Sequence, residues 1–202
     1  YRNWQTAEEE KYKAELLFLK SQINPHFLFN ILNSIYVQAI RKAENTAPSI
    51  MKLSSIMRYV ISEGHQPLVP LEKEIGYVSD YIDLQKMRLS NSIIVDYQLN
   101  IQQQDLMIAP LLLITFIENA FKHGISTEED GVIKITIDIS NSQLLMNVRN
   151  NKYKTALREE EQSGIGIKNT KKRLNLIYPD KHELTIENND TSYTAILKLN
   201  LS

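Results

Sequence analysis

The sequence contains no cysteine among its 202 residues. This absence excludes disulfide bonds, cysteine-ligated zinc and thiol chemistry, and it is typical of a protein in a reducing compartment. The formal net charge is only -1 and the pI is near 6.5, so neither nucleic acid nor an anionic membrane is favoured as the main partner. Hydrophobic residues make up 43% of the chain, which is enough for a core, and the length allows one or two domains.

A membrane-spanning run is also missing. The longest apolar stretch, residues 106–117, is too short to cross a bilayer as a helix and is interrupted by Pro110. No signal peptide, internal repeat or low-complexity tract is visible. Because the chain starts at Tyr1 and not at a methionine, we expect it to be a fragment of a longer protein.

Residues 1–64 have the pattern of two helices. Apolar residues in steps of four and three across residues 12–23 have the spacing of a coiled-coil seam, which turns polar at His26 and Asn30. From there we expect the apolar face to move over to Leu28, Leu32, Ile35 and Ala39. His26 and Asn30 are therefore expected to be accessible, beside a bend that Pro25 introduces.

A second helix is expected after a turn at residues 43–47, and it stops near Gly64. Its apolar side carries Ile50, Leu53, Met57, Val60 and Ile61. Two antiparallel helices of this kind leave much apolar surface exposed in a monomer. We therefore expect a homodimer in which two copies close a four-helix bundle.

Residues 65–202 are predicted to form a second domain of the α+β class, with a mixed sheet and helices on one face. The boundary follows from the extended, proline-bearing residues 66–70. Helices are expected at residues 71–89, 108–123 and 168–178, and strands at 93–101, 132–139, 143–148, 183–187 and 193–199. The second of these helices is entered through Pro110, and a hairpin turns at Asn141-Ser142.

His26 is the first candidate for chemistry. Histidine side chains titrate near neutral pH, so an imidazole can act as a nucleophile without a strong base. Asn30 lies four residues further, on the same helical face, where it could orient the ring or touch a transferred phosphate. A lone histidine beside a helix bend is more often an ordinary surface residue. The motifs further along the chain favour the nucleophile.

The second candidate is the helix end around Asn119. Asn119 and His123 are four residues apart and share a face. An amide oxygen suits Mg²⁺ that also holds phosphate oxygens, and Lys122 and His123 could donate hydrogen bonds along a phosphate chain. The alternative is an ordinary polar helix end with Gly124 as its C-cap.

The third candidate is a glycine loop containing Gly164 and Gly166, whose N–H groups could point at phosphates. The helix after it adds positive charge through Lys168, Lys171, Lys172 and Arg173. Residues 158–161 before it are interpreted as a lid or a solvated loop. Most Gly-x-Gly pairs are turns, so the order of helix, hairpin, glycine loop and basic helix carries more weight than any single motif. A Walker-type loop and the motif set of serine/threonine-type kinases are absent.

These motifs resemble the sensor histidine kinases of the LytS/YehU type. Pro25-His26-Phe27-Leu28-Phe29-Asn30 is similar to the family's phosphoacceptor motif. Residues 71–88 are similar to its linking helix, residues 110–124 to its N-box, and residues 164–169 to its second glycine box. The resemblance covers nearly the whole chain.

The resemblance implies a dimerisation and phosphoacceptor domain at residues 1–64 and a GHKL (Bergerat-type) ATP-binding domain, an α/β sandwich, at residues 65–202. It implies ATP and Mg²⁺ as cofactors, with Asn119 holding the metal. It also implies a response regulator as partner. The chain would then be the cytoplasmic portion of an inner-membrane protein, attached to the membrane only through an N-terminal sensor region that is absent from this sequence.

One motif departs from the family. Its first glycine box usually reads Asp-x-Gly, and the aspartate accepts a hydrogen bond from the adenine amino group. Here the strand leads into Asn150-Asn151-Lys152. Asn150 keeps an acceptor oxygen but loses the charge, which weakens that contact, and Lys152 stands where a glycine is expected.

The leading hypothesis is an ATP-dependent protein-histidine kinase that phosphorylates its own His26 and passes the group to an aspartate of a response regulator. One alternative, motivated by Asn150 and Lys152, is a non-catalytic dimeric signalling scaffold with a degenerate nucleotide pocket. Another is a GHKL ATPase that drives a conformational clamp, which the phosphoacceptor motif and the short chain disfavour.

Overall fold

The structure is a computed structural model that describes residues 25–202, except for residues 91, 104, 127–128 and 154–159 and the side chains of residues 160–165. It divides into two compact units. The first comprises the described residues up to Gln66 together with Ser79–Arg88, and the second comprises Pro67–Val78 and Leu89–Ser202. Helix α4 (Leu71–Lys86) therefore starts in the second unit and ends in the first.

The first unit contains helices α2 (Pro25–Ile40) and α3 (Thr46–Glu63), which contact one another, and the second half of α4. Helix α2 ends where Lys42 adopts a left-handed conformation with φ 51°. The N–H of Ala43 then donates to the carbonyl of Gln38 over 3.0 Å, which closes the last turn. The coiled-coil seam predicted over residues 12–23, and the bend predicted at Pro25, involve residues outside the described part of the chain.

The buried side of α2 differs from the predicted one. Phe27, Ile31 and Ile35 are buried, whereas Leu32 is 46% exposed. The predicted stripe is therefore confirmed at Ile35 and wrong at Leu32 and Ala39, which are exposed, while Leu28 is half-buried. The reason is a third packing partner: the ring of Phe27 stacks on Tyr81 of α4, with 4.6 Å between ring centroids. Both stripes are apolar at helical spacing, so periodicity alone does not choose between them.

Helix α3 shows a similar shift. Its buried residues are Ser49, Leu53, Ile56, Tyr59 and Val60. Leu53 and Val60 were predicted to be buried, but Ile50 and Ile61 are exposed. The side chain of Lys52 on α3 forms an ion pair with Asp83 on α4, and Ser49 Oγ contacts Met87 Sδ at 3.3 Å. The second half of α4 thus contacts a face of α3 that would be exposed to solvent in a hairpin of two helices.

The second unit is built on a five-stranded mixed sheet, ordered β2-β4-β5-β7-β6. Its strands are β2 (Ile93–Ile101), β4 (Gly131–Ser140), β5 (Gln143–Asn151), β6 (His182–Asn188) and β7 (Ser192–Asn200). β2 and β4 pair in parallel, and the other neighbours are antiparallel. Two short strands, β1 (Val69–Pro70) and β3 (Met107–Ile108), pair separately. The predicted α+β class with a mixed sheet is confirmed.

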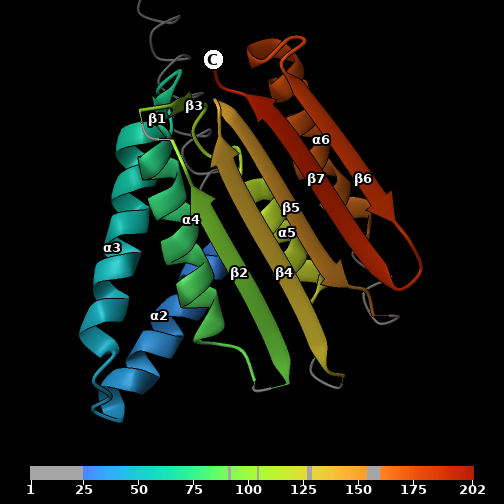
Figure 1. Ribbon diagram of the computed structural model, residues 1–202. Helices are drawn as coiled ribbons and strands as arrows, with labels where there is room; N and C mark the ends of the chain where they lie inside the picture. The colour runs from blue at the N-terminus through green and yellow to red at the C-terminus, as the bar shows by residue number, and fades with distance from the viewer. Residues whose placement is uncertain (1–24, 91, 104, 127–128, 154–159) are drawn as a thin grey trace, which may run out of the picture. The chain divides into compact units, whose positions relative to one another are not determined.

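Helices α5 (Ile114–His123) and α6 (Glu160–Ile177) lie on the same face of this sheet (Figure 1). Strand β4 shows the corresponding alternation. Its residues Ile133, Ile135, Ile137 and Ile139 are almost fully buried, whereas Val132 is 45% exposed. Such alternation is typical of a sheet with one face on the core and the other in solvent. The hairpin between β4 and β5 turns at Asn141 and Ser142, both with positive φ, as predicted.

Two predicted elements in this unit were wrong. The helix expected from residue 108 begins only at Ile114, because Leu111 adopts a left-handed φ of 56°, which no α-helix permits. The glycine loop is the second error, because Gly164 and Gly166 lie inside α6. A glycine in a helix costs only about 1 kcal/mol. Packing of the same helix through the buried Thr170 and Leu174 can offset that cost.

Within the described residues, the helices are too short or too polar to span a membrane.

Candidate functional site

His26 lies at the start of the described part of α2 and is exposed. The amide nitrogen of Asn30 lies 3.2 Å from His26 Nδ1 and 3.1 Å from Nε2. The side-chain contact expected from their spacing is therefore present. An amide NH₂ group can donate only to the ring nitrogen that carries no proton, so the tautomer of His26 decides which ring nitrogen Asn30 holds.

The second group of candidate residues lies on α5 of the other unit. Asn119 and His123 are half-buried, share a face of the helix and border its buried side, whereas Lys122 is exposed. The helix ends at Gly124, whose N–H donates to the carbonyl of Ala120 over 2.7 Å. All three polar side chains therefore lie in the last two turns of one helix.

Gly124 brings the end of α5 against strand β5. A Cβ atom at this position would lie 2.6 Å from the carbonyl oxygen of Ala120 and 2.6 Å from the Cβ of Asn150. Atoms do not approach so closely without a shift, so only glycine fits here. The structure thus brings together the Asn119 helix and Asn150, two features that lie far apart in the sequence.

Asn150 itself is only 1% exposed. Its amide nitrogen donates to the carbonyl oxygen of Asn151 over 2.7 Å, and since a carbonyl can only accept, this bond fixes which way the amide points. The other end, Oδ1, is buried and has no hydrogen-bond partner within the described residues. An acceptor left in that state costs about 1–3 kcal/mol and is typical of a site that a ligand completes.

Lys152, the other departure from the family motif, has its ammonium group at strand β6. Its ammonium group donates to Asn188 Oδ1 on β6 over 2.9 Å. The neighbouring Asn151 accepts from the N–H of Val132 over 2.9 Å. Both polar side chains after Asn150 are therefore engaged with the sheet.

Helix α6 runs beside α5. A Cβ atom on Gly166 would lie 3.5 Å from Cγ2 of Thr115, and Thr115 is one turn before Asn119 on the same face of α5. Gly166 is thus close to the Asn119 face, although it lies in a helix and not in a loop. Of the segment 158–161 that was interpreted as a lid or loop, residues 158 and 159 lie outside the described part of the chain, and Glu160 and Glu161 belong to α6.

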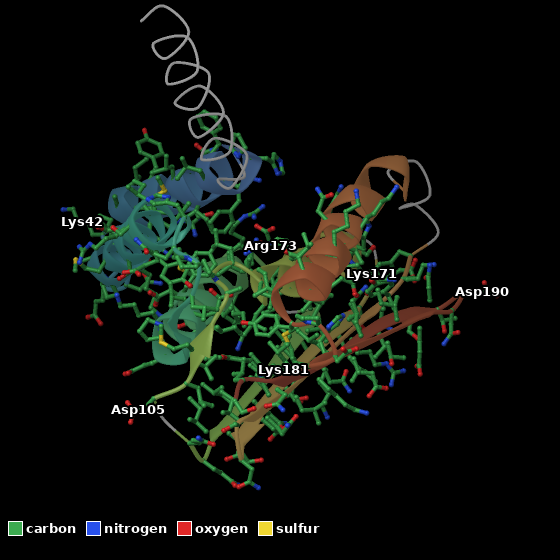
Figure 2. All side chains as sticks on the ribbon, turned by 90° about the horizontal axis from the view of Figure 1, so that it is seen from above. Lys42, Asp105, Lys171, Arg173, Lys181 and Asp190 are labelled. Carbon is green, nitrogen blue, oxygen red and sulfur yellow. The ribbon has the colours of Figure 1, made fainter. Side chains whose placement is uncertain are left out.

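The cationic side chains of α6 do not act as one group. Figure 2 shows Lys171 and Arg173 on opposite sides of the helix. Lys168, Lys171 and Lys172 are exposed, but Arg173 donates through Nη2 to the carbonyl oxygen of Pro110 over 2.8 Å. The guanidinium of Arg173, which was expected to add positive charge near the glycine motif, holds a backbone carbonyl through one of its N–H groups.

Sequence reasoning missed the role of Glu74. Its side chain is fully buried, and its carboxylate accepts the N–H groups of Leu111, Leu112 and Leu113 over 2.9, 3.0 and 3.1 Å. A signal was present in the sequence. Glu74 lies at helical spacing on the same apolar stripe of α4 as Leu71 and Val78, where a charge needs a partner.

Glu118 adjoins Asn119 on α5 and is half-buried. Burial raises the pKa of its carboxyl group to about 7. The described residues contain no cluster of three or more His, Cys, Asp or Glu that could hold a metal alone. A cation at Asn119 would therefore depend on ligands from a bound nucleotide, which suits Mg²⁺, an ion usually bound by few protein groups together with phosphates.

Comparison with known proteins agrees with these features. Residues 14–93 match the family model described as histidine kinase. The sensor protein LytS of Streptococcus mutans is 26% identical over 90% of this chain, and the sensor histidine kinase YpdA of Escherichia coli is 32% identical over 82% of it. The predicted resemblance to the LytS-type sensor histidine kinases is thereby confirmed.

The chain spans about a third of the length of these curated relatives, 33% of LytS and 31% of YpdA. Among solved structures, the histidine kinase domain of a blue-light activated histidine kinase from Erythrobacter litoralis matches with a TM-score of 0.48 and 16% identity. That match covers 95% of this chain and 96% of the other. A likeness this distant says nothing about the site.

The close approach at Gly124 predicts opposite effects for two glycine substitutions. Gly124→Ala should lower the free energy of unfolding by about 1–3 kcal/mol, because its methyl group meets backbone and the root of Asn150. Gly76→Ala in α4 is the control, since nothing lies within 4 Å of its Cβ position. It should raise stability by about 0.5–1 kcal/mol. Urea denaturation measures both, and equal effects would contradict the assigned packing.

The raised pKa of Glu118 predicts a stability that depends on pH. The native state holds the proton up to about pH 7, whereas the unfolded chain loses it near 4.5, so this group's stabilising effect is complete below 4.5 and is lost as the pH rises to about 7. Relative to Glu118→Gln, the wild type should lose up to about 3 kcal/mol between pH 4.5 and 8. Denaturation curves at several pH values check this, and parallel profiles for the two proteins would refute it.

Proposed function

We propose that this chain is the phosphoacceptor and ATP-binding part of a sensor histidine kinase. It transfers the γ-phosphate of ATP to His26, from which the group passes to an aspartate of a response regulator. The observation that carries the proposal is the buried acceptor oxygen of Asn150 beside the Asn119 helix. The exposed His26 with Asn30 at hydrogen-bond distance supports it from the other unit.

In this proposal the second unit is a GHKL-type domain with ATP as its substrate. The amino group of adenine would donate to Asn150 Oδ1, the acceptor that lacks a partner within the described residues. Asn119 would hold Mg²⁺, which when bound neutralises charge on the phosphate oxygens. Lys122 and His123 lie on the same helix end and would donate to those oxygens.

His26 would attack through the ring nitrogen that carries the lone pair. The new N–P bond forms as the bond between the γ-phosphorus and the bridging oxygen of ADP breaks, and the ring then gives up its proton. Asn30 would orient the imidazole before the transfer. Positioning of this kind supplies much of the rate enhancement when the protein contributes little covalent chemistry.

A dimeric scaffold without catalysis remains the second candidate, since Asn150 is neutral where relatives of this type carry an aspartate. The contact of Lys152 with Asn188 weighs against the scaffold, because that ammonium group is held on the sheet.

The parent protein would be attached to the membrane by a region that precedes this sequence.

Incubation with radiolabelled ATP and Mg²⁺ tests the proposed transfer. The wild type should acquire label that is stable to base and labile to acid, as a phosphorus–nitrogen bond requires, and His26→Gln should acquire none. His65→Gln is the matched control, because His65 is also an exposed histidine, and it should label like the wild type. Label that survives His26→Gln would overturn the transfer to this residue. Failure of the wild type both to acquire label and to bind ATP in calorimetry would favour the scaffold.

The first unit also supports a homodimer. Large apolar side chains on α2 and α3 are exposed in the single chain: Phe29, Leu32, Tyr36, Ile40, Ile50 and Ile61. A second copy could cover them by closing a four-helix bundle. Sedimentation equilibrium should therefore give the mass of two chains, and Tyr36→Glu, which places a charge on this surface, should shift it toward one. A wild-type mass of one chain at all concentrations would exclude the dimer.

A further inference from the structure

Residues 109–113, which lead into α5, are held almost entirely by side chains. Three of their N–H groups donate to the carboxylate of Glu74 on α4. The carbonyl of Pro110 accepts from Arg173 over 2.8 Å, and the N–H of Ala109 donates to the hydroxyl of Tyr178 over 2.8 Å. Five hydrogen bonds thus hold these five residues to Glu74 on α4, Arg173 on α6 and Tyr178, the residue after α6.

The three side chains form one cluster. Burial raises the pKa of the Tyr178 hydroxyl, the nearby charge of Glu74 raises it further, and the N–H of Ala109 and the charge of Arg173 lower it. Glu74 and Arg173 are thus both near enough to act on the same hydroxyl. An acid, a base and a phenol share this small buried region, and the backbone of residues 109–113 supplies their hydrogen-bond partners.

The backbone that they hold is strained. Leu111 is buried and has a φ of 56°, a conformation that costs a non-glycine residue about 1–2 kcal/mol. Such a conformation persists only where the surroundings over-determine it, and it is concentrated at sites where position matters. The N–H of Leu111 is one of the three that Glu74 accepts. The carboxylate therefore stabilises the one residue that keeps the chain from entering α5 earlier.

We propose that Glu74 is a positioning residue for the nucleotide site: with Arg173 and Tyr178 it sets where α5 begins and so where that helix presents Asn119. Asn119 lies five residues after Ile114, the first residue of α5, so a shift at the start of the helix moves it directly. The inference rests on the proposed function only for the identity of the ligand. The hold on residues 111–113 can be measured without nucleotide.

Calorimetry of ATP binding to the whole chain, with Mg²⁺ and again with EDTA, tests the effect on the site. Glu74→Gln keeps the size of the side chain but sets an amide NH₂ against backbone N–H groups. It should weaken binding of Mg²⁺–ATP about 10-fold, which is the usual effect of losing a residue that orients a metal-binding side chain. In EDTA, ATP would be held mainly through Asn150. Its affinity should then change less than about 2-fold, since no Mg²⁺ held by Asn119 contributes to binding. Glu72→Gln, an exposed position on the same helix, should match the wild type in both.

Hydrogen exchange provides the second readout. The amides of residues 111–113 should exchange faster in Glu74→Gln than in the wild type, and should be unchanged in Glu72→Gln. If the wild type binds no ATP, the proposed function fails, while faster exchange in Glu74→Gln still supports the hold on this segment. Unchanged exchange would overturn it.

A merely structural role predicts a different pattern. Glu74→Gln would then weaken binding equally with and without Mg²⁺, or would bind normally at temperatures where it is folded, and either result overturns the proposal. If Glu74→Gln does not fold, Tyr178→Phe replaces it, since it removes only the acceptor for the N–H of Ala109. It should show a smaller loss that is again confined to the Mg²⁺-dependent part of the affinity.

Discussion

The buried carboxylate of Glu74 is the interaction on which the second unit depends. A charge removed from water is costly unless hydrogen bonds replace the lost solvent. The start of a helix offers that replacement, because its first N–H groups lack partners within the helix. Here the N–H groups of residues 111–113 and the carboxylate satisfy one another just before α5. The other end of α5 is fixed by the close contact of Gly124 with Asn150. Asn119 lies between these two fixed points, which would let it serve with Asn150 in the proposed nucleotide site.

In the proposed site, Asn150 would determine how strongly the adenine base is held. A carboxylate acceptor makes a hydrogen bond roughly twice as strong as a neutral one, so an amide gives up part of that energy. In return, a buried amide is cheaper to remove from water than a buried charge. Its orientation is already fixed by the bond to the carbonyl of Asn151, so a donor group on the ligand meets an acceptor that needs no rearrangement. In the proposed site, Asn150 would therefore accept from the adenine amino group in a fixed orientation, but more weakly than an aspartate would.

Much of this arrangement could be predicted from the sequence, and the failures have physical causes. Strand β2 and the turn at Asn141-Ser142 follow from alternation and turn chemistry, which are local properties. The start of α5 and the buried face of α2 do not, because Glu74 and Tyr81 decide them from distant parts of the chain. The glycines of α6 looked like a loop because a helix tolerates them only when packing, here through Thr170 and Leu174, offsets their cost. The pairing of His26 with Asn30 was predictable from spacing, whereas the contact of Gly124 with Asn150 needed the fold.

Locating the phosphoryl group is the most direct test of the central claim, that His26 accepts phosphate from ATP bound at the Asn119–Asn150 site. The chain would be incubated with ATP and Mg²⁺, digested at neutral or basic pH and sequenced by mass spectrometry under conditions that preserve phosphohistidine. The account predicts one modified peptide, with the phosphoryl group on His26, and its disappearance when Mg²⁺ is chelated. A phosphoryl group found on another residue, or release of inorganic phosphate from ATP with His26 unmodified, would contradict it.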